Sequence, residues 1–422
     1  MKIIYLHQYY TSPEMSGGTR SYEMARRMVS AGHEVHMVTS YRDAEGRRDG
    51  WFQTTEAGIK VHWYSVPYSN QLGFYQRLRA FFSFAFAARE KALSLDGDVV
   101  FATSTPLTIA LPAVFVARKK QIPMVFEVRD LWPEMPIAVG ALNNPLLRFA
   151  AYRLEYWAYQ NASSVVALSP GMKAGVVRAG YPASKVAVIP NSSDNVEFLH
   201  DCTKAMQFRS SREWLGERPL LVYAGTFGQV NGVEYMVSLA YELLKLNSNV
   251  RILLVGDGRE RPNLQRAAEQ AGVLNVNLFV ENPLSKKEVP GLLSAATVAS
   301  NLVIDLPQAH ANSANKFFDT LAAGKPILLN HGGWMHDLVK SRNCGLALWH
   351  YPMAKAAAEV DQKLNDTEWL EKAGASARAL AEECFDRDKL AAQLMEVLQA
   401  SVNGYPEICE KIAPGEYGQQ GN

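Results

Sequence analysis

Short apolar runs alternate with amphipathic helical segments along most of the chain, and this alternation is the feature that most limits its fold. An apolar run at 2–7 is followed by a loop, a helical segment at 20–30 and a second apolar run at 34–39. Further runs lie at 60–66, 98–102 and 123–128. Strands that alternate with helices predict a parallel sheet covered on both faces, so we expect an α/β fold.

A second series of the same kind begins near Pro219. The polar run at 191–194 precedes it and suits a connection between domains. We therefore expect a domain at 1–192, a second at 193–385, a terminal helix at 386–401 that packs toward the first domain, and a tail at 402–422.

Composition excludes several classes of protein. The 422 residues suffice for two domains. With 43 basic and 42 acidic residues the net charge is +1, so the protein has no strong overall positive potential that would attract nucleic acid. The longest apolar stretch, at 107–117, is too short to span a membrane, and the four cysteines lack disulfide-like spacing. We expect a cytoplasmic protein that touches a membrane only at its surface.

The stretch at 312–329 predicts a loop, a short helix, a glycine stop and a strand. The amino end of a helix attracts phosphate, because its N–H groups lack partners and its dipole is positive there. Lys316 stands in the first turn, and Asp319, one turn later, could accept hydrogen bonds from two ribose hydroxyls. An ordinary surface helix fits the pattern equally well.

Glycines follow three of the predicted strands. Gly17 and Gly18 lie in the first loop without a full GxGxxG pattern, so they either admit a ligand or form a simple turn. Gly225 and Gly256 each end a strand of the second series. Two such junctions in one sheet predict several free N–H groups at one edge.

Charged residues gather directly after the strand at 123–128. The run from Glu127 to Glu134 concentrates acids, an arginine (Arg129) and a tryptophan (Trp132), which would be costly to bury without partners, so they are expected to line a cleft. The alternative is a structural salt bridge between Arg129 and a nearby acid. Asp96-Gly97-Asp98 matches a DxD metal motif but begins a strand, which favours a turn.

Residues 74–93 combine phenylalanines with arginines and lysine. Such a helix can rest on an anionic bilayer or hold a lipid acceptor, although aromatic stripes also belong to cores. No metal constellation is evident among the nine histidines, and His33 and His36 are interpreted as structural.

Taken together, these motifs resemble the retaining glycosyltransferases of family 4. Gly17-Gly18, the run at 188–192, the Gly225 and Gly256 junctions and the segment at 318–326 carry the resemblance, which covers residues 1 to about 400. It implies the GT-B fold, in which two doubly wound Rossmann-like domains face a cleft. Within this family, the segment Arg129-Asp130-Leu131-Trp132-Pro133 is similar to the matching segment of bacterial enzymes that add N-acetylated amino sugars, such as fucosamine, to lipid-linked surface polysaccharide.

The resemblance also implies a reaction and its site. The donor would be a UDP-sugar, the acceptor a polyprenyl-diphosphate-linked glycan in O-antigen or capsule synthesis, and neither metal nor cofactor would be required. Asp319 matches the acid that holds the donor ribose, and Gly17 and Gly18 match the loop that faces the transferred sugar. Asp130, Arg129 and Lys316 are the candidate catalytic residues. The remaining candidates for donor binding are Gly225, Asn231, Gly256, Ser313, Asn315 and Phe317.

The chain departs from the family pattern at several positions. The family has a pair of acids in this region, and the position of the first acid is occupied by Ala311 in this chain. The position of a histidine that is common in the cleft of the family is occupied by Arg129. The positions of an arginine and a lysine that often contact the diphosphate are occupied by Thr226 and Asn231. Because two cations are therefore missing, Lys316 gains importance. Two alternatives stay open: a sugar-nucleotide 2-epimerase, which would need no acceptor, and a non-catalytic nucleotide-sugar-binding subunit.

Overall fold

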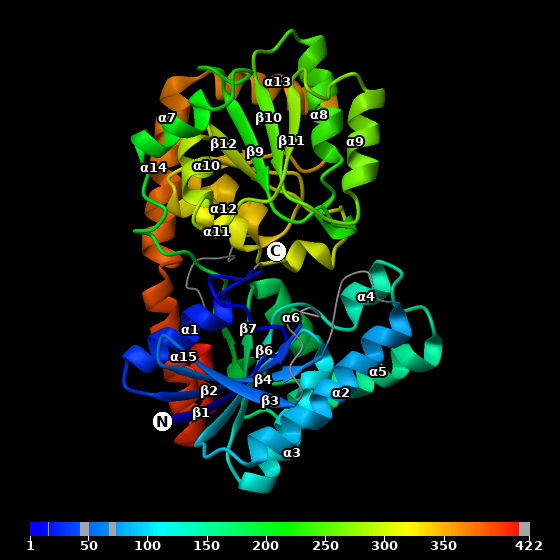
Figure 1. Ribbon diagram of the computed structural model, residues 1–422, viewed down its shortest axis with the longest axis vertical. Helices are drawn as coiled ribbons and strands as arrows, with labels where there is room; N and C mark the ends of the chain where they lie inside the picture. The colour runs from blue at the N-terminus through cyan, green and yellow to red at the C-terminus, as the bar shows by residue number, and fades with distance from the viewer. Residues whose placement is uncertain (16, 43–49, 67–72, 413–422) are drawn as a thin grey trace. The chain divides into compact units, whose positions relative to one another are not determined.

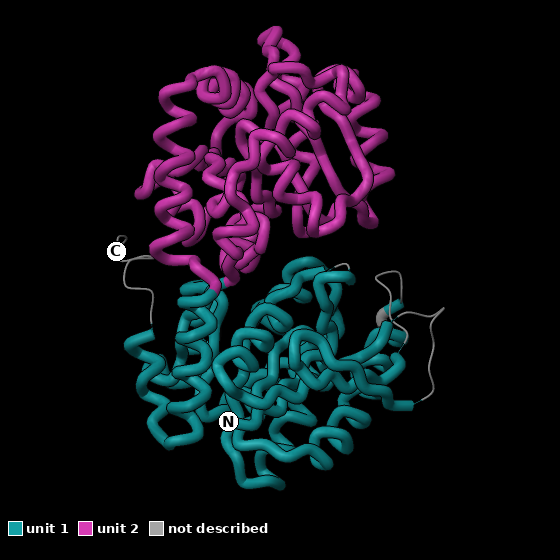
Figure 2. Tube along the Cα trace, turned by 60° about the vertical axis from the view of Figure 1, so that its left-hand side comes forward, with its two compact units in different colours: residues 1–190, 388–415 teal, residues 191–387, 416–422 magenta. Residues whose placement is uncertain are grey.

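The computed structural model describes residues 1–15, 17–42, 50–66 and 73–412. These residues form two compact units (Figure 2). Unit 1 comprises Met1–Pro190 and the described part of Asp388–Gly415, and unit 2 comprises Asn191–Arg387. Residues 413–422 of the predicted tail lie outside the described residues.

Unit 1 is built on a sheet whose strands follow the order β3-β4-β2-β1-β5-β6-β7-β8 (Figure 1). Every neighbouring pair is parallel except β3 and β4, which are antiparallel. The prediction of a parallel sheet is therefore confirmed apart from β3, which the sequence did not reveal. The strands are β1 (Lys2–Leu6), β2 (Glu34–Tyr41), β3 (Trp51–Glu56), β4 (Ile59–Ser65), β5 (Val99–Thr103), β6 (Met124–Val128), β7 (Ser164–Ala167) and β8 (Val186–Val188).

The helices of unit 1 bury apolar residues against this sheet. Met24, Ala25 and Met28 of α1 share one core with Ile3 and Tyr5 of β1, and α15 adds Leu394 and Leu398 to it. α2 and α3 pack against each other and against strands of the sheet. The helices are α1 (Arg20–Ser30), α2 (Phe74–Leu93), α3 (Ala110–Lys120), α4 (Glu134–Ala138), α5 (Pro145–Gln160), α6 (Pro170–Arg178) and α15 (Arg387–Val402).

The segment after α15 is not a frayed tail as far as residue 412. Cys409 and Ile412 are buried in the core of unit 1, and the N–H of Val188 donates to the carbonyl of Ile412. Burial of these apolar side chains holds the segment against β8, so the prediction of a tail from residue 402 was wrong for this part.

Unit 2 contains a wholly parallel sheet in the order β11-β10-β9-β12-β13-β14. Leu221 and Tyr223 of β9 join one core, whereas Leu220 and Val222 join another, so both faces of the sheet are covered. The strands are β9 (Leu220–Ala224), β10 (Arg251–Val255), β11 (Leu278–Glu281), β12 (Val298–Asn301), β13 (Ile327–Leu329) and β14 (Gly345–Ala347). The helices are α7 (Cys202–Ser210), α8 (Tyr235–Lys245), α9 (Arg261–Gln270), α10 (Val289–Ala295), α11 (Asn315–Ala322), α12 (Trp334–Arg342), α13 (Met353–Leu364) and α14 (Thr367–Cys384).

The predicted elements at 312–329 are all present. α11 ends before Gly324, whose φ of +62° suits a glycine, and β13 follows at once. Among the described residues, no helix combines the length and the apolar character needed to cross a bilayer.

Candidate functional site

The loops after β9 and β10 lie against each other at the carboxyl edge of the unit 2 sheet. The N–H of Gly225 donates to the carbonyl of Val255 (2.9 Å), and that of Gly256 donates to Glu281 (3.2 Å). A Cβ on Gly256 would lie 1.9 Å from the carbonyl oxygen of Gly225. These glycines are therefore required by the contact of two loops, and their own N–H groups are not among the free N–H groups predicted at this edge.

Lys316 reaches this edge from the first turn of α11. Its Nζ donates to the hydroxyl of Tyr223 (2.9 Å) and to Oδ1 of Asn231 (3.3 Å). A Cβ on Gly225 would lie 3.2 Å from the same Nζ. The structure thus brings together three predicted site residues, Lys316, Gly225 and Asn231, and adds Tyr223, which the sequence analysis missed.

The ammonium of Lys316 is held by neutral groups. Besides the two hydrogen bonds, it lies 4.3 Å from the centroid of the Tyr223 ring. Burial lowers the pKa of Lys316 from 10.5 to about 7. A half-buried cation with neutral partners gains most from an anion, which would restore the favourable interaction that burial removes.

The start of α11 is only partly open to a ligand. Ala314 occupies the N-cap position, so no side chain caps the helix, but the N–H of Phe317 donates to the carbonyl of Ala314 (3.1 Å). The Phe317 ring is fully buried with Phe318 in the core of unit 2. Phe317 therefore contributes packing, and its N–H is not free for a diphosphate. Asn315, half-buried, is the first residue of the helix.

Ser313, which precedes α11, is buried and engaged. Its hydroxyl accepts a hydrogen bond from the N–H of Asn191 (3.1 Å), and its carbonyl accepts from the Asn191 side chain. These bonds fix the loop before α11 to the first residue of unit 2. Ser313 thus has a structural partner in place of an open side chain.

Asp319 follows Lys316 by three residues, which places both on one side of α11. Burial raises the pKa of Asp319 from 3.8 to about 6, while the charge of Arg387 and the hydroxyl of Ser193 lower it. The carboxyl group is half-buried and interacts with Ser193 and Arg387, which lie near the first and last residues of unit 2 in the sequence. Its contact with a ribose stays a prediction.

In unit 1, polar side chains meet at the ends of three adjacent strands, β1, β5 and β6. Nη1 of Arg129 lies 3.2 Å from Nε2 of His7, and the N–H of Arg129 donates to the hydroxyl of Ser104 (3.0 Å). The hydroxyl of Thr105 donates to Asp130 (3.1 Å). Because these are the carboxyl ends of parallel strands, Arg129 and Asp130 lie where open α/β sheets bind ligands.

His7 is buried, and its pKa is lowered well below the ordinary value by burial and by the charges of Arg129 and Arg42. A neutral imidazole can accept at Nε2 from the guanidinium, which only donates. The sequence analysis missed this role, although the position of His7 directly after β1 was the available signal. Arg129 is thus oriented by His7 instead of by an acid.

Both units match models of known protein families. Residues 17–192 match the glycosyl transferase 4-like domain, and residues 206–380 match the glycosyl transferases group 1 family. The chain is built from two glycosyltransferase domains.

Curated relatives are distant. Alpha-D-kanosaminyltransferase of Streptomyces kanamyceticus is 22% identical over 57% of this chain and 60% of its own length. The probable glycosyltransferase WbjE of Pseudomonas aeruginosa is 23% identical over 68% of this chain and 71% of its own length. The chain therefore spans about three fifths of the kanosaminyltransferase that it matches.

Solved structures share the architecture of both glycosyltransferase domains. Anabaena HepE in complex with UDP and glucose aligns with a TM-score of 0.70 at 18% identity, over 95% of this chain and 100% of that chain. Sucrose-phosphate synthase from Thermosynechococcus elongatus aligns with a TM-score of 0.75 at 15% identity, over 94% of this chain and 98% of that chain. The expected GT-B fold class is confirmed.

In the glycosyl transferase 4-like domain, Glu127 and Glu134, the acids on either side of Arg129 and Asp130, each pair with an arginine. Glu127 is fully buried, where it accepts hydrogen bonds from Arg20 (2.9 and 3.0 Å). Glu134 pairs with Arg178 at 2.8 Å. The prediction that these acids line a cleft was therefore wrong for Glu127, whose charge is neutralised inside the domain.

Gly17 and Gly18 are exposed in the loop before α1. Gly17 has a φ of +138°, and a Cβ there would lie 3.0 Å from the Thr11 side chain. The Thr11 hydroxyl donates to the carbonyl of Gly18 (2.8 Å). These contacts explain a tight turn, and a role toward the transferred sugar stays a prediction.

The aspartates of the DxD motif and the histidines considered as metal ligands contact protein groups. Asp98 accepts a hydrogen bond from the N–H of Lys2 (2.7 Å), and Asp96 pairs with the Lys2 side chain, as expected of a turn. Nδ1 of His36 lies 3.0 Å from Nε2 of His62. In the described part of the chain, no group of three or more His, Cys, Asp or Glu residues could hold a metal ion.

Proposed function

We propose that the chain transfers a sugar from a UDP-sugar to a lipid-linked glycan, with retention at the anomeric carbon and without a metal. The observation that carries the proposal is the convergence of Lys316 with Gly225 and Asn231 at the amino end of α11. A cation beside a helix start is a site for the diphosphate of a nucleotide sugar.

In the proposed reaction, an acceptor hydroxyl forms a bond to the anomeric carbon while the bond from that carbon to the diphosphate oxygen breaks. The hydroxyl proton passes to the leaving diphosphate. Lys316 stabilises the negative charge that grows on this group, and the positive end of the α11 dipole adds to that effect. Asp319 holds the ribose through its carboxylate.

The proposed acceptor side is the strand edge of the 4-like domain. Asp130, oriented by Thr105, orients the acceptor hydroxyl or accepts a hydrogen bond from it. Arg129, oriented by His7, contacts the sugar or a phosphate. We further propose an N-acetylated amino sugar as the transferred group. The acceptor would be a polyprenyl-diphosphate-linked glycan of bacterial surface polysaccharide, at the inner face of the plasma membrane. The relatives named alpha-D-kanosaminyltransferase and probable glycosyltransferase WbjE support sugar transfer itself.

The proposal is tested first by thermal shift against a panel of nucleotide sugars, because a bound donor raises apparent stability. Lys316→Met should strongly reduce the shift that the best donor produces at a fixed donor concentration. Lys325→Met is the matched control, because burial also lowers the pKa of Lys325, to about 8, although it lies at the far end of α11. This control should keep the full shift.

Transfer is then measured with the best donor and a lipid-linked acceptor. The expected product keeps the anomeric configuration of the donor. Conversion of the UDP-sugar to another sugar without acceptor would replace the proposal by an epimerase. Tight donor binding without transfer to any acceptor would indicate a binding subunit.

A further inference from the structure

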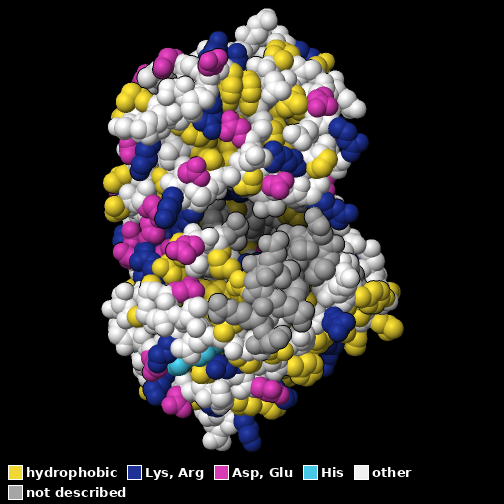
Figure 3. Space-filling view, in the orientation of Figure 1, with side chains coloured by type: hydrophobic (Ala, Val, Ile, Leu, Met, Phe, Trp, Pro, Cys, Tyr) yellow, Lys and Arg dark blue, Asp and Glu magenta, His cyan; other side chains and the backbone are white. Residues whose placement is uncertain are grey.

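Exposed aromatic and aliphatic side chains concentrate on three helices of unit 1, α2, α3 and α5, which we call the α2–α3–α5 surface. α3 packs against both neighbours. Phe86 is 63% exposed and Phe149 is 68% exposed. Further exposed rings are Phe82, Phe115, Tyr152 and Tyr156, and Figure 3 shows hydrophobic side chains over α5. Several exposed apolar side chains on neighbouring helices are typical of an interaction site.

The same three helices are strongly basic. Their sequences contain nine lysines and arginines and two glutamates, and one of these, Glu155, is buried. The whole chain carries a net charge of only +1. Positive charge is therefore gathered where the apolar side chains are exposed.

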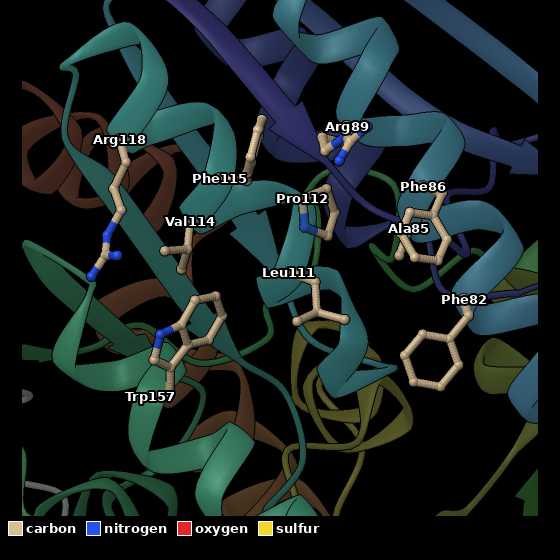
Figure 4. A pocket seen from close by; sticks show the side chains of 10 residues that line it. All are labelled: Phe82, Ala85, Phe86, Arg89, Leu111, Pro112, Val114, Phe115, Arg118 and Trp157. Carbon is tan, nitrogen blue, oxygen red and sulfur yellow. The ribbon is translucent and has the colours of Figure 1, made fainter.

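A groove of about 330 Å³ opens between these helices (Figure 4). Its walls are mainly apolar and include Phe82, Phe86, Leu111 and Trp157, while Arg89 and Arg118 also line it. The guanidinium of Arg89 lies 4.9 Å from the centroid of the Phe115 ring. Long basic side chains that cover aromatic rings in this way can bury their stems in an apolar phase and keep their charges in the headgroup layer.

We propose that the α2–α3–α5 surface docks the protein on an anionic lipid bilayer. Rings at the surface would enter the boundary between headgroups and acyl chains, and the basic side chains would meet anionic lipids. A second copy of the chain does not suit this surface, because two equally basic faces would repel each other. The groove would receive part of a lipid chain.

The proposal deepens the proposed function, because a lipid-linked acceptor lies in a bilayer. It can fail separately, since the test needs neither donor nor acceptor. The full-length protein is sedimented with vesicles of phosphatidylcholine alone or mixed equally with phosphatidylglycerol. We expect binding to the mixed vesicles and at least tenfold weaker binding to phosphatidylcholine. Binding should weaken at 1 M salt, where the screening length falls to about 3 Å.

Two double variants separate the apolar and charged contributions. Phe82→Ser with Phe86→Ser should weaken binding to the mixed vesicles at least tenfold, because both exposed rings are lost. Arg79→Gln with Lys119→Gln, both exposed on this surface, should weaken it about 25-fold, at about fivefold for each charge. Circular dichroism establishes that each variant is folded.

Matched controls lie in unit 2. Tyr241→Ser with Leu246→Ser removes side chains that are 43% and 47% exposed, and Lys287→Glu changes an exposed charge. Neither control should alter vesicle binding. The proposal is overturned if the wild-type protein ignores the mixed vesicles, if the controls weaken binding as much as the surface variants, or if the surface variants instead dissociate a dimer.

Discussion

Lys316 makes donor binding dependent on pH in a way that calorimetry can measure. Burial holds the pKa of this lysine at about 7 in the free protein. A bound diphosphate favours the charged form, so the pKa should rise when the donor binds. Above pH 7, the free protein must therefore take up a proton to bind a UDP-sugar.

The size of the effect follows from the pKa. At pH 8, a lysine with a pKa of about 7 is roughly 10% protonated, so binding should take up about 0.9 proton. Relative to pH 7, where the lysine is about half protonated, donor affinity should fall about fivefold by pH 8 and about sixteenfold by pH 8.5. The diphosphate of a UDP-sugar is fully ionised throughout this range and contributes no proton.

The assay titrates the UDP-sugar at several pH values in buffers with different ionisation enthalpies. Lys316→Arg is the matched variant, because a guanidinium stays protonated and should give a flat profile without proton uptake. Lys316→Met should weaken binding about 10- to 150-fold at pH 7, the usual size of a charged hydrogen bond. Wild-type affinity that is constant from pH 7 to 8.5, with no proton uptake, would refute the assignment of Lys316 to the diphosphate.

Three further substitutions test individual contacts. Asp319→Asn should raise the free energy of unfolding at pH 7 by at most about 3 kcal/mol. The pKa of Asp319 is about 6 in the folded protein and 3.8 ordinarily, so the buried charge destabilises the fold increasingly as pH rises from about 4 to 6, and the substitution removes this cost. The same variant should weaken donor binding by about 1.5–3 kcal/mol, and unchanged affinity would remove Asp319 from the site. Gly256→Ala should destabilise by about 1–3 kcal/mol or more, since its Cβ would meet the Gly225 carbonyl at 1.9 Å, whereas Gly228→Ala, with its nearest atom at 3.4 Å, should have little effect in urea unfolding. Glu127→Gln should cost about 3–5 kcal/mol by leaving Arg20 uncompensated, and Glu134→Gln, which breaks a more exposed pair, at most about 1 kcal/mol; equal losses would contradict the distinction.

Periodicity was sufficient to predict the elements that are buried on both faces. The parallel strands of unit 2 from β9 to β13 are short apolar runs that follow one another with helical segments between them. β14, which has only three residues and begins with a glycine, was not predicted. β3 was missed because its sequence, WFQTTE, is only half-buried and lies at the sheet edge. Its hairpin turn uses Ala57 and Gly58, both with positive φ, and not the asparagine-glycine pair that marks such turns in sequences.

The candidate sites depend on sheet order, which local patterns do not contain. His7 and Arg129 are 122 residues apart, and they meet only because β1 and β6 lie on either side of β5. Tyr223 was missed for a related reason. It alternates with apolar residues along β9, so the sequence indicates a core position, whereas its hydroxyl ends at the strand edge beside Lys316.

The departure of this chain from the family pattern at Asn231 coincides with a contact to Lys316. The resemblance expects a lysine at position 231, and the structure places the ammonium of Lys316 3.3 Å from the Asn231 side chain. Two lysines at these positions would bring two cations into one half-buried space, which would lower stability.

This reasoning predicts that the cation can be moved from one position to the other. Asn231→Lys alone should lower the free energy of unfolding by like-charge repulsion. In the Lys316→Met background, the same substitution should restore at least tenfold of the lost donor affinity, because the new ammonium has no competitor. Calorimetry on the two single variants and the double variant measures the coupling. If the double variant binds the donor no better than Lys316→Met, the diphosphate does not occupy the space that these two side chains share.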